Sequence, residues 1–120
     1  MELVDVYNER HEKLNYSKGR KELNDGEYRL SCFIWVINDK NEILLQQRLA
    51  TAKKMPNMWG TTAGGAQKGD SSLTGAMREL KEELGIDARK EEMVFIGSYK
   101  RINDFVEVWL CKKNIEVNAL

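Results

Sequence analysis

The spacing of apolar residues predicts one long amphipathic helix over residues 71–84. Asp70, Ser71 or Ser72 can cap its first turn, because their side-chain oxygens can accept hydrogen bonds from free backbone N–H groups. Gly85 can end the helix, because glycine adopts the left-handed conformation without steric cost. The apolar side chains that recur at helical spacing, and therefore share one face, are Leu73, Ala76, Met77, Leu80 and Leu84.

Runs of β-branched and aromatic residues, separated by turn residues, predict a set of strands. The apolar cluster at residues 3–7 predicts a short strand, and the polar stretch that follows it to Gly26 predicts a loop. Residues 38–41, Asn-Asp-Lys-Asn, supply a turn between two strands. The remaining predicted strands are residues 28–37, 42–48, 59–63, 93–99 and 105–112. Together with the helix they predict an α/β fold with a mixed sheet.

The length and the charge of the chain narrow the classes of function. A chain of 120 residues fits one domain, residues 1–120, and no linker or repeat divides it. Lys plus Arg and Asp plus Glu each number 19, so no net positive field exists to bind a nucleic acid polymer or an anionic membrane nonspecifically. An anionic substrate must be held by local contacts. No apolar run approaches the roughly 20 residues that cross a bilayer, and the start lacks a signal-peptide plan, which predicts a cytoplasmic location.

The cysteine and histidine content excludes several kinds of site. Cys32 and Cys111 are the only cysteines and form no CxxC motif, which argues against a disulfide scaffold and a structural zinc site. Both thiols are predicted to be reduced and buried. His11 is the only histidine, which excludes any mechanism that needs two imidazoles. Carboxylates must therefore carry the chemistry.

Three glutamates form the strongest candidate site. Glu79, Glu82 and Glu83 are related by i, i+3 and i+4, so on a helix their side chains project from one stripe. Three such acids repel one another unless a cation lies among them, and Mg²⁺, for which Mn²⁺ can substitute, prefers oxygen ligands beside substrate phosphates. The loop of residues 64–69 can add a backbone carbonyl. Taken alone, the stripe also fits the solvated face of an amphipathic helix.

The spacing of the whole segment favours the functional interpretation. Residues 64–86 read GGAQKGDSSLTGAMRELKEELGI, which resembles the Nudix hydrolase signature G-x5-E-x7-R-E-U-x-E-E-x-G-U, where U is a bulky aliphatic residue. Every fixed position matches except one, because Asp70 stands where the family has Glu. The resemblance covers about residues 28–112, and includes residues 43–48 and 56–59. It implies the Nudix α/β/α sandwich. Residues 64–86 are called the box segment below.

The resemblance implies a role for each box residue. Glu82 and Glu83 resemble the principal metal ligands, and Glu79 resembles a further ligand or the base that prepares the attacking water. A backbone oxygen at Gly64 or its predecessor would complete the metal shell. Arg78 resembles the arginine that orients these carboxylates. The residues implied to hold the loop and the helix in place are Gly64, Asp70 and Gly85, although Asp70 also fits a simple helix cap.

The implied reaction is Mg²⁺-dependent hydrolysis of a diphosphate linkage in a nucleoside diphosphate derivative, a small-molecule substrate. Arg48 and Lys53 or Lys54 are candidate phosphate contacts, because cations near the glycine loop can hold an anionic substrate. The alternative for these three residues is a solvated surface position.

Two other functions compete with hydrolysis. The N-terminal residues 5–9 and 26–29 resemble the entry segment of the isopentenyl-diphosphate isomerase branch of the superfamily. That chemistry needs a cysteine immediately before the box glycine and histidine ligands, whereas this chain has Ala63 there and Arg29 where a histidine often stands. A noncatalytic Nudix-like module that binds a nucleotide or a protein is the second competitor, and the intact carboxylate stripe argues against it.

The C-terminal part of the sequence carries one further expectation. Relatives usually continue through an acidic loop, another strand and a closing helix, and residues 114–120 do not replace them. We therefore expect the C-terminal strand and helix of the sandwich to be missing. One face of the sheet should then expose apolar side chains of residues 93–99 and 105–110. The chain is expected either to be part of a longer protein or to close its sheet as a homo-oligomer, and Glu116 is expected to be an exposed strand residue rather than a substitute ligand.

Overall fold

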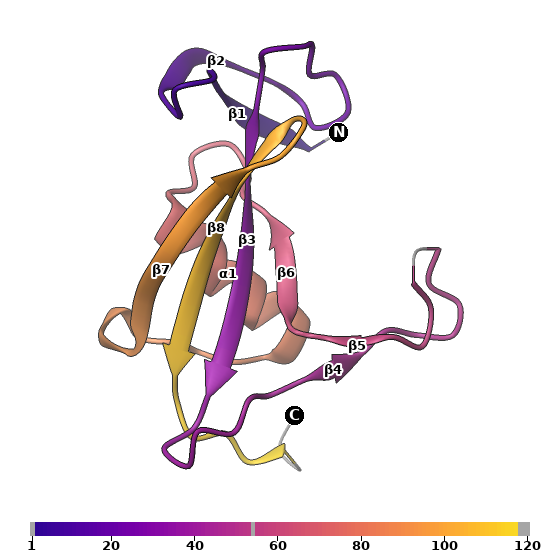
Figure 1. Ribbon diagram of the computed structural model, residues 1–120, viewed down its shortest axis with the longest axis vertical. Helices are drawn as coiled ribbons and strands as arrows, with labels where there is room; N and C mark the ends of the chain where they lie inside the picture. The colour runs from indigo at the N-terminus through magenta and orange to yellow at the C-terminus, as the bar shows by residue number, and fades with distance from the viewer. Residues whose placement is uncertain (1, 54, 118–120) are drawn as a thin grey trace.

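A four-stranded mixed sheet forms the centre of the computed structural model, which describes residues 2–53 and 55–117 (Figure 1). Its strand order is β6-β3-β8-β7, and the inner pair β3 and β8 is parallel while the other pairs are antiparallel. The bounds are Arg29–Ile37 for β3, Thr62–Gly65 for β6, Met93–Lys100 for β7 and Asp104–Lys112 for β8. A short 3₁₀ helix, η1 at Lys90–Glu92, precedes β7. This architecture confirms the α/β prediction.

Helix α1, Ser72–Leu84, confirms the predicted helix and lies behind the sheet in Figure 1. Ser71 is the residue that caps it, because its Oγ accepts the Thr74 backbone N–H at 3.1 Å. Gly85 has φ of 68° and ends the helix, and its N–H bonds back to the carbonyls of Leu80 and Lys81. Local sequence therefore fixes both ends of the element that carries the carboxylate stripe.

The face of the sheet that α1 covers contains the hydrophobic core. Leu80 and Ala76 are fully buried against alternate residues of β3, and Ile86 closes the core after the helix. Both cysteines are free and buried, as predicted. The buried core residues on this face are Cys32, Ile34, Val36, Ala76, Leu80, Ile86, Met93 and Cys111.

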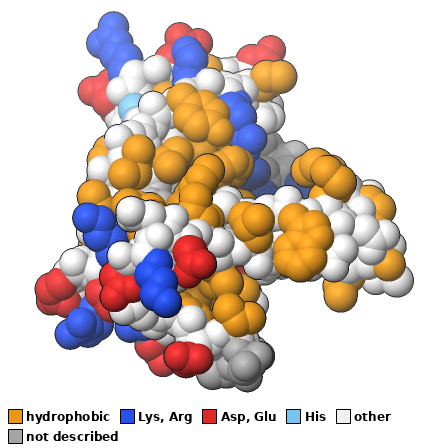
Figure 2. All heavy atoms as spheres, turned by 60° about the horizontal axis from the view of Figure 1, so that its bottom comes forward, with side chains coloured by type: hydrophobic (Ala, Val, Ile, Leu, Met, Phe, Trp, Pro, Cys, Tyr) orange, Lys and Arg blue, Asp and Glu red, His pale blue; other side chains and the backbone are white. Residues whose placement is uncertain are grey.

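The opposite face of the sheet exposes apolar side chains, as the sequence predicts. Trp35 is 42% exposed and Ile96 is 59% exposed, and both line a shallow apolar hollow of about 420 Å³ with Phe33 and Tyr99. Figure 2 shows apolar side chains gathered over this part of the molecule. Within residues 2–53 and 55–117, α1 is the only α-helix, and residues 113–117 add no strand. Self-association through this face stays a prediction. No helix in the described part of the chain is long and apolar enough to cross a membrane.

The N-terminal residues form a hairpin rather than the predicted strand and loop. Strand β1, Leu3–Tyr7, pairs with β2, Lys13–Gly19, and Tyr7 bridges to Tyr28 beside the main sheet. The loop prediction is wrong for β2 because its sequence KLNYSKG is mostly polar, so no apolar alternation marks it. Strand β2 forms because it pairs with β1, and its own sequence does not mark it as a strand.

Residues 43–60 form an arm that extends away from the sheet (Figure 1). The predicted strand over residues 42–48 is a strand only at β4, Gln46–Gln47, which pairs with β5, Trp59–Gly60, while Ile43 makes an isolated bridge to Ile37 of β3. The prediction of a strand over residues 59–63 is divided in the structure between β5 and β6. A longer pairing is not formed, and the apolar side chains of the arm stay exposed (Figure 2): Ile43, Leu45, Leu49, Met55, Met58 and Trp59.

Candidate active site

The glycine pair at the end of β6 brings the sheet backbone directly against the helix carboxylates. Gly64 pairs with Cys32 of β3, and α1 crosses the sheet so that the Glu79 carboxyl group lies on Gly64. A Cβ atom at Gly64 would collide with that carboxyl group. Only glycine therefore allows Glu79 to occupy this place, where its side chain is 12% exposed.

Arg78 connects the loop to the carboxylate stripe. Its Nη2 donates to the Gly65 carbonyl at 3.0 Å and to Asp70 Oδ2 at 2.9 Å. Its Nη1 donates to Glu79 Oε1 at 3.2 Å and to Glu82 Oε2 at 3.0 Å. One guanidinium group thus orients three carboxylates and fixes the end of β6, which a lysine could not do with a single point charge.

Asp70 keeps the arginine contact although its side chain is one methylene shorter than the family's glutamate. Its Oδ2 accepts bonds from both Nε and Nη2 of Arg78, at 3.2 and 2.9 Å, and also accepts the Gln67 backbone N–H at 2.8 Å. The helix cap is Ser71, so Asp70 is not the cap in this structure. The loop turns tightly, since the Asp70 N–H bonds to the Gln67 carbonyl, and this turn brings the shorter side chain within reach.

Glu79 and Glu83 lie four positions apart on α1, so their side chains share one face of the helix. Burial, together with the neighbouring Glu83, raises the pKa of Glu79 to about 7 against the opposing effect of Arg78. Burial is the larger cause of the raised pKa, and the negative charges of Glu83 and Glu82 add to it. A cation bound beside these carboxylates would relieve the same repulsion.

The residues present fit a hard divalent ion in their donor chemistry. Glu79, Glu82 and Glu83 offer only oxygen ligands, and the backbone of Gly64 lies against Glu79. Across residues 2–53 and 55–117, however, no three His, Cys, Asp or Glu side chains already converge on one point. Glu82 instead faces Arg78, and because its side chain is 55% exposed it can turn without disturbing the core. The oxygen donors therefore suit such an ion, but the described side chains are not gathered around one centre.

A cavity of about 270 Å³ adjoins Glu83 on the side of the arm. Its lining includes the predicted phosphate contact Arg48, so the fold brings Arg48 and Glu83 to one hollow. Lys53 is exposed in the loop of the arm, and Lys54 lies outside the described residues. The lining residues are Gln46, Gln47, Arg48, Leu49, Ala52 and Glu83.

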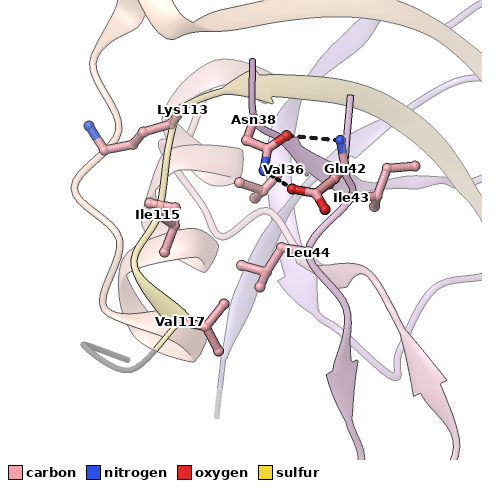
Figure 3. Close-up of a pocket in the computed structure, with 8 residues that line it drawn as sticks. All are labelled: Val36, Asn38, Glu42, Ile43, Leu44, Lys113, Ile115 and Val117. Carbon is pink, nitrogen blue, oxygen red and sulfur yellow. Dashed lines mark hydrogen bonds between the residues drawn. The ribbon is translucent and has the colours of Figure 1, made fainter. Parts of the chain in front are cut away.

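A second cavity, of about 240 Å³, lies between residues 36–44 and residues 113–117 (Figure 3). Its polar groups are already paired: Asn38 and Glu42 bond to each other at 2.8 and 2.9 Å, and Lys113 points away to Glu92. Apolar side chains of Ile43 and its neighbours form the rest of the wall. This cavity offers no converging reactive groups and is not a catalytic candidate. Glu116 is exposed near it, as predicted, but it lies beyond the end of β8 and not in a strand.

Two residues near the helix face were not identified from the sequence. Gln46 donates from Nε2 to Glu83 Oε1 at 2.9 Å, across 37 positions of the chain. Glu107 lies buried on β8 with His11 Nε2 at 3.0 Å from its Oε1, while its Oε2 has no hydrogen-bond partner among the described residues. The sequence does carry a signal for Glu107: this acid stands between Phe105 and Trp109, apolar residues on the same face of the strand, where a charged side chain is uncommon. No local pattern marks Gln46.

Comparisons with known proteins agree with the site. A family model described as the NUDIX domain matches residues 27–119. The chain is 35% identical over 125 residues to a protein of Listeria innocua named Uncharacterized Nudix hydrolase lin0387, with 100% of this chain and 72% of that protein covered. It is 37% identical over 103 residues to Uncharacterized Nudix hydrolase CA_C0446 of Clostridium acetobutylicum, with 82% of this chain and 50% of that protein covered.

A solved structure shares the fold at low sequence identity. DR0079 from Deinococcus radiodurans superposes with a TM-score of 0.74 at 17% identity, over 96% of this chain and 74% of that chain. The chain thus spans between half and three quarters of the length of these three proteins. Because the family match covers most of the chain and the sequence relatives exceed 30% identity, this chain belongs to the Nudix hydrolase family.

Proposed function

We propose that the chain is a Mg²⁺-dependent pyrophosphohydrolase that cleaves a diphosphate linkage in a nucleoside diphosphate derivative. The observation that carries this proposal is the position of the Glu79 carboxyl group against the Gly64 backbone, one helical turn from Glu83, which lines a cavity together with Arg48. The carboxylates supply oxygen ligands for the ion, and the guanidinium group of Arg48 binds the anionic substrate in the adjoining cavity.

In this proposal Glu79, Glu82, Glu83 and the Gly64 backbone hold the ion. Bound Mg²⁺, or Mn²⁺ in its place, lowers the pKa of an attacking water and neutralises charge on the diphosphate. Family membership and the oxygen-only donor set support this assignment.

The residues of the chain perform the remaining steps. Arg78 keeps Glu79 and Glu82 in fixed orientations through its two Nη1 contacts. Glu79 is the candidate base, because its carboxylate is shielded from solvent and can accept the proton of the attacking water. Arg48 and Lys53 contact the phosphate oxygens from the arm, which holds the substrate in the hollow beside Glu83.

A turnover screen tests the proposal. Purified protein is incubated with Mg²⁺ or Mn²⁺ and with nucleotide sugars, dinucleoside polyphosphates, NADH, ADP-ribose, oxidised nucleoside triphosphates and isopentenyl diphosphate. Release of a nucleoside monophosphate or inorganic phosphate that EDTA abolishes supports the hydrolase. Saturable binding without turnover indicates a noncatalytic module instead, and formation of dimethylallyl diphosphate indicates an isomerase.

A further inference from the structure

Gln46 lies at the point where the arm meets the carboxylate stripe. Its Nε2 donates to Glu83 Oε1 at 2.9 Å. Its backbone pairs with Gly60 of β5, and the chain continues from Gly60 into β6, the strand that carries Gly64. The position of Gln46 is therefore linked to Gly64 through strand pairing as well as to Glu83 through its side chain.

Glu83 differs from the other two glutamates in how it is held. Arg78 donates to Glu79 and to Glu82, at 3.2 and 3.0 Å, and its remaining bonds go to Asp70 and Gly65. Glu83 is exposed in the last turn of α1, where its side chain bonds to Gln46. The amide that donates to Glu83 thus comes from the arm, whereas the guanidinium group of the box segment donates to Glu79 and Glu82.

The chemistry of an amide suits this position. A glutamine donates one hydrogen bond without adding charge, so it fixes one carboxylate oxygen and leaves the charge of Glu83 available to a cation. A lysine or arginine there would compete with the cation for the same carboxylate, and an acid would repel it. Outer partners of this kind commonly set the orientation of a metal ligand.

We propose that Gln46 is a positioning residue that orients Glu83 for metal binding and so connects the arm to the metal site. The inference rests on the proposed function, because it takes Glu83 as a ligand. With this role for Gln46, the arm belongs to the metal site as well as to the cavity that holds the substrate. The position of the arm and the affinity for the ion therefore depend on each other.

The neighbouring glutamine provides a matched control. Gln47 Nε2 donates to the Asn57 carbonyl at 3.0 Å, which is a contact inside the arm. Gln46→Met and Gln47→Met each remove one amide from β4 at nearly constant side-chain length, and only the first removes a bond to Glu83. Gln46→Asn keeps the amide but shortens the side chain by one methylene, so it too should lose the contact.

The measurement is the Mn²⁺ dissociation constant without substrate, from titrations followed by electron paramagnetic resonance of free Mn²⁺. Gln46→Met and Gln46→Asn should each raise it roughly tenfold, the low end of the range for outer partners, since this contact is exposed. Gln47→Met should leave it within about twofold of wild type. An unchanged constant in both Gln46 variants, or an equal rise in Gln47→Met, would overturn the inference.

Glu83→Gln separates failure of the inference from failure of the proposed function. If Glu83→Gln weakens Mn²⁺ binding while both Gln46 variants bind as wild type does, Glu83 is a ligand and only the role of Gln46 is wrong. If Glu83→Gln also binds Mn²⁺ as wild type does, the metal site itself is misplaced. Melting temperatures in EDTA confirm that each variant is folded.

Discussion

The box segment and the arm line one cavity, but they are built in opposite ways. The box segment packs Leu80 into the core, buries Glu79 against Gly64 and joins its loop to its helix through Arg78. The arm contains only two strands of two residues each, β4 and β5, and exposes most of its apolar side chains. The difference separates two tasks: fixed carboxylates need a packed support, whereas a segment that meets the substrate can be extended and lightly held.

The charges of the two segments are also complementary. The box segment carries the acidic stripe, while residues 43–60 contain Arg48, Lys53 and Lys54 and no Asp or Glu. In the proposed function, a metal ion on the acidic stripe and the cationic side chains of the arm hold a diphosphate between them. Mutations in the box segment should therefore lower stability or turnover, whereas mutations in the arm should weaken binding of the substrate or the ion.

The largest expected contrast concerns stability. Leu80→Ala removes a fully buried side chain beneath the box helix and should lower the free energy of unfolding by about 2–5 kcal/mol. Leu49→Ala in the arm, where the side chain is 75% exposed, should change it by less than about 0.5 kcal/mol. Urea denaturation of both variants measures the difference. Equal losses would show that the arm is packed as firmly as the helix.

The second contrast concerns turnover. Glu82→Gln keeps the shape of the side chain but removes a charged ligand, and should lower kcat by at least about 100-fold. The free energy of unfolding should change by less than about 0.5 kcal/mol, because the lost Arg78 pair is largely exposed. Glu91→Gln, at an exposed position in η1, is the control and should be active. Wild-type turnover in Glu82→Gln at saturating Mg²⁺ would remove Glu82 from the metal site.

Sequence alone predicted the box segment far better than the arm, for a physical reason. The helix over residues 71–84, its Gly85 stop and the strand over residues 28–37 follow from neighbouring residues, through apolar period, capping and β-branched runs. The pairing of β4 and the bond from Gln46 to Glu83 depend on residues far apart in the chain. No spacing rule reaches across 37 positions, so the arm was predicted as a longer strand.

Glycines in the two segments give a finer test of the same contrast. Gly64→Ala places a methyl group where the Glu79 carboxyl group lies, so Glu79 must move and kcat should fall about tenfold or more. Gly60→Ala in the arm meets no atom within 4 Å and should retain activity within about threefold. Both variants should melt near wild type, because Glu79 can rotate its flexible end. Equal kcat values for the two variants would contradict the contact between β6 and the helix.

The pH dependence of stability tests the crowding of the box carboxylates. Burial and the neighbouring Glu83 raise the pKa of Glu79 from 4.5 to about 7 in the metal-free protein. The folded protein then binds this proton more tightly than the unfolded chain, so the stability it contributes is present below pH 4.5 and is lost as the pH rises through about 7. Denaturation in EDTA at pH 5 and pH 8 should show the loss, and Glu79→Gln should reduce it. If Glu79→Gln leaves the dependence of stability on pH unchanged, other titratable groups cause that dependence.

The smallest expected effect lies in the arm and decides whether the arm serves affinity or chemistry. Arg48 lines the hollow beside Glu83, so Arg48→Ala should remove a charge-assisted contact to the substrate without moving the carboxylates. One such contact at an open site is worth about 1 kcal/mol, which corresponds to a KM about fivefold higher with kcat nearly constant. Arg10→Ala, an exposed arginine in the N-terminal hairpin, controls for the lost charge and should leave both constants unchanged. If Arg48→Ala instead lowers kcat at constant KM, the guanidinium acts in the transition state, and the arm belongs to the catalytic machinery as fully as the box segment does.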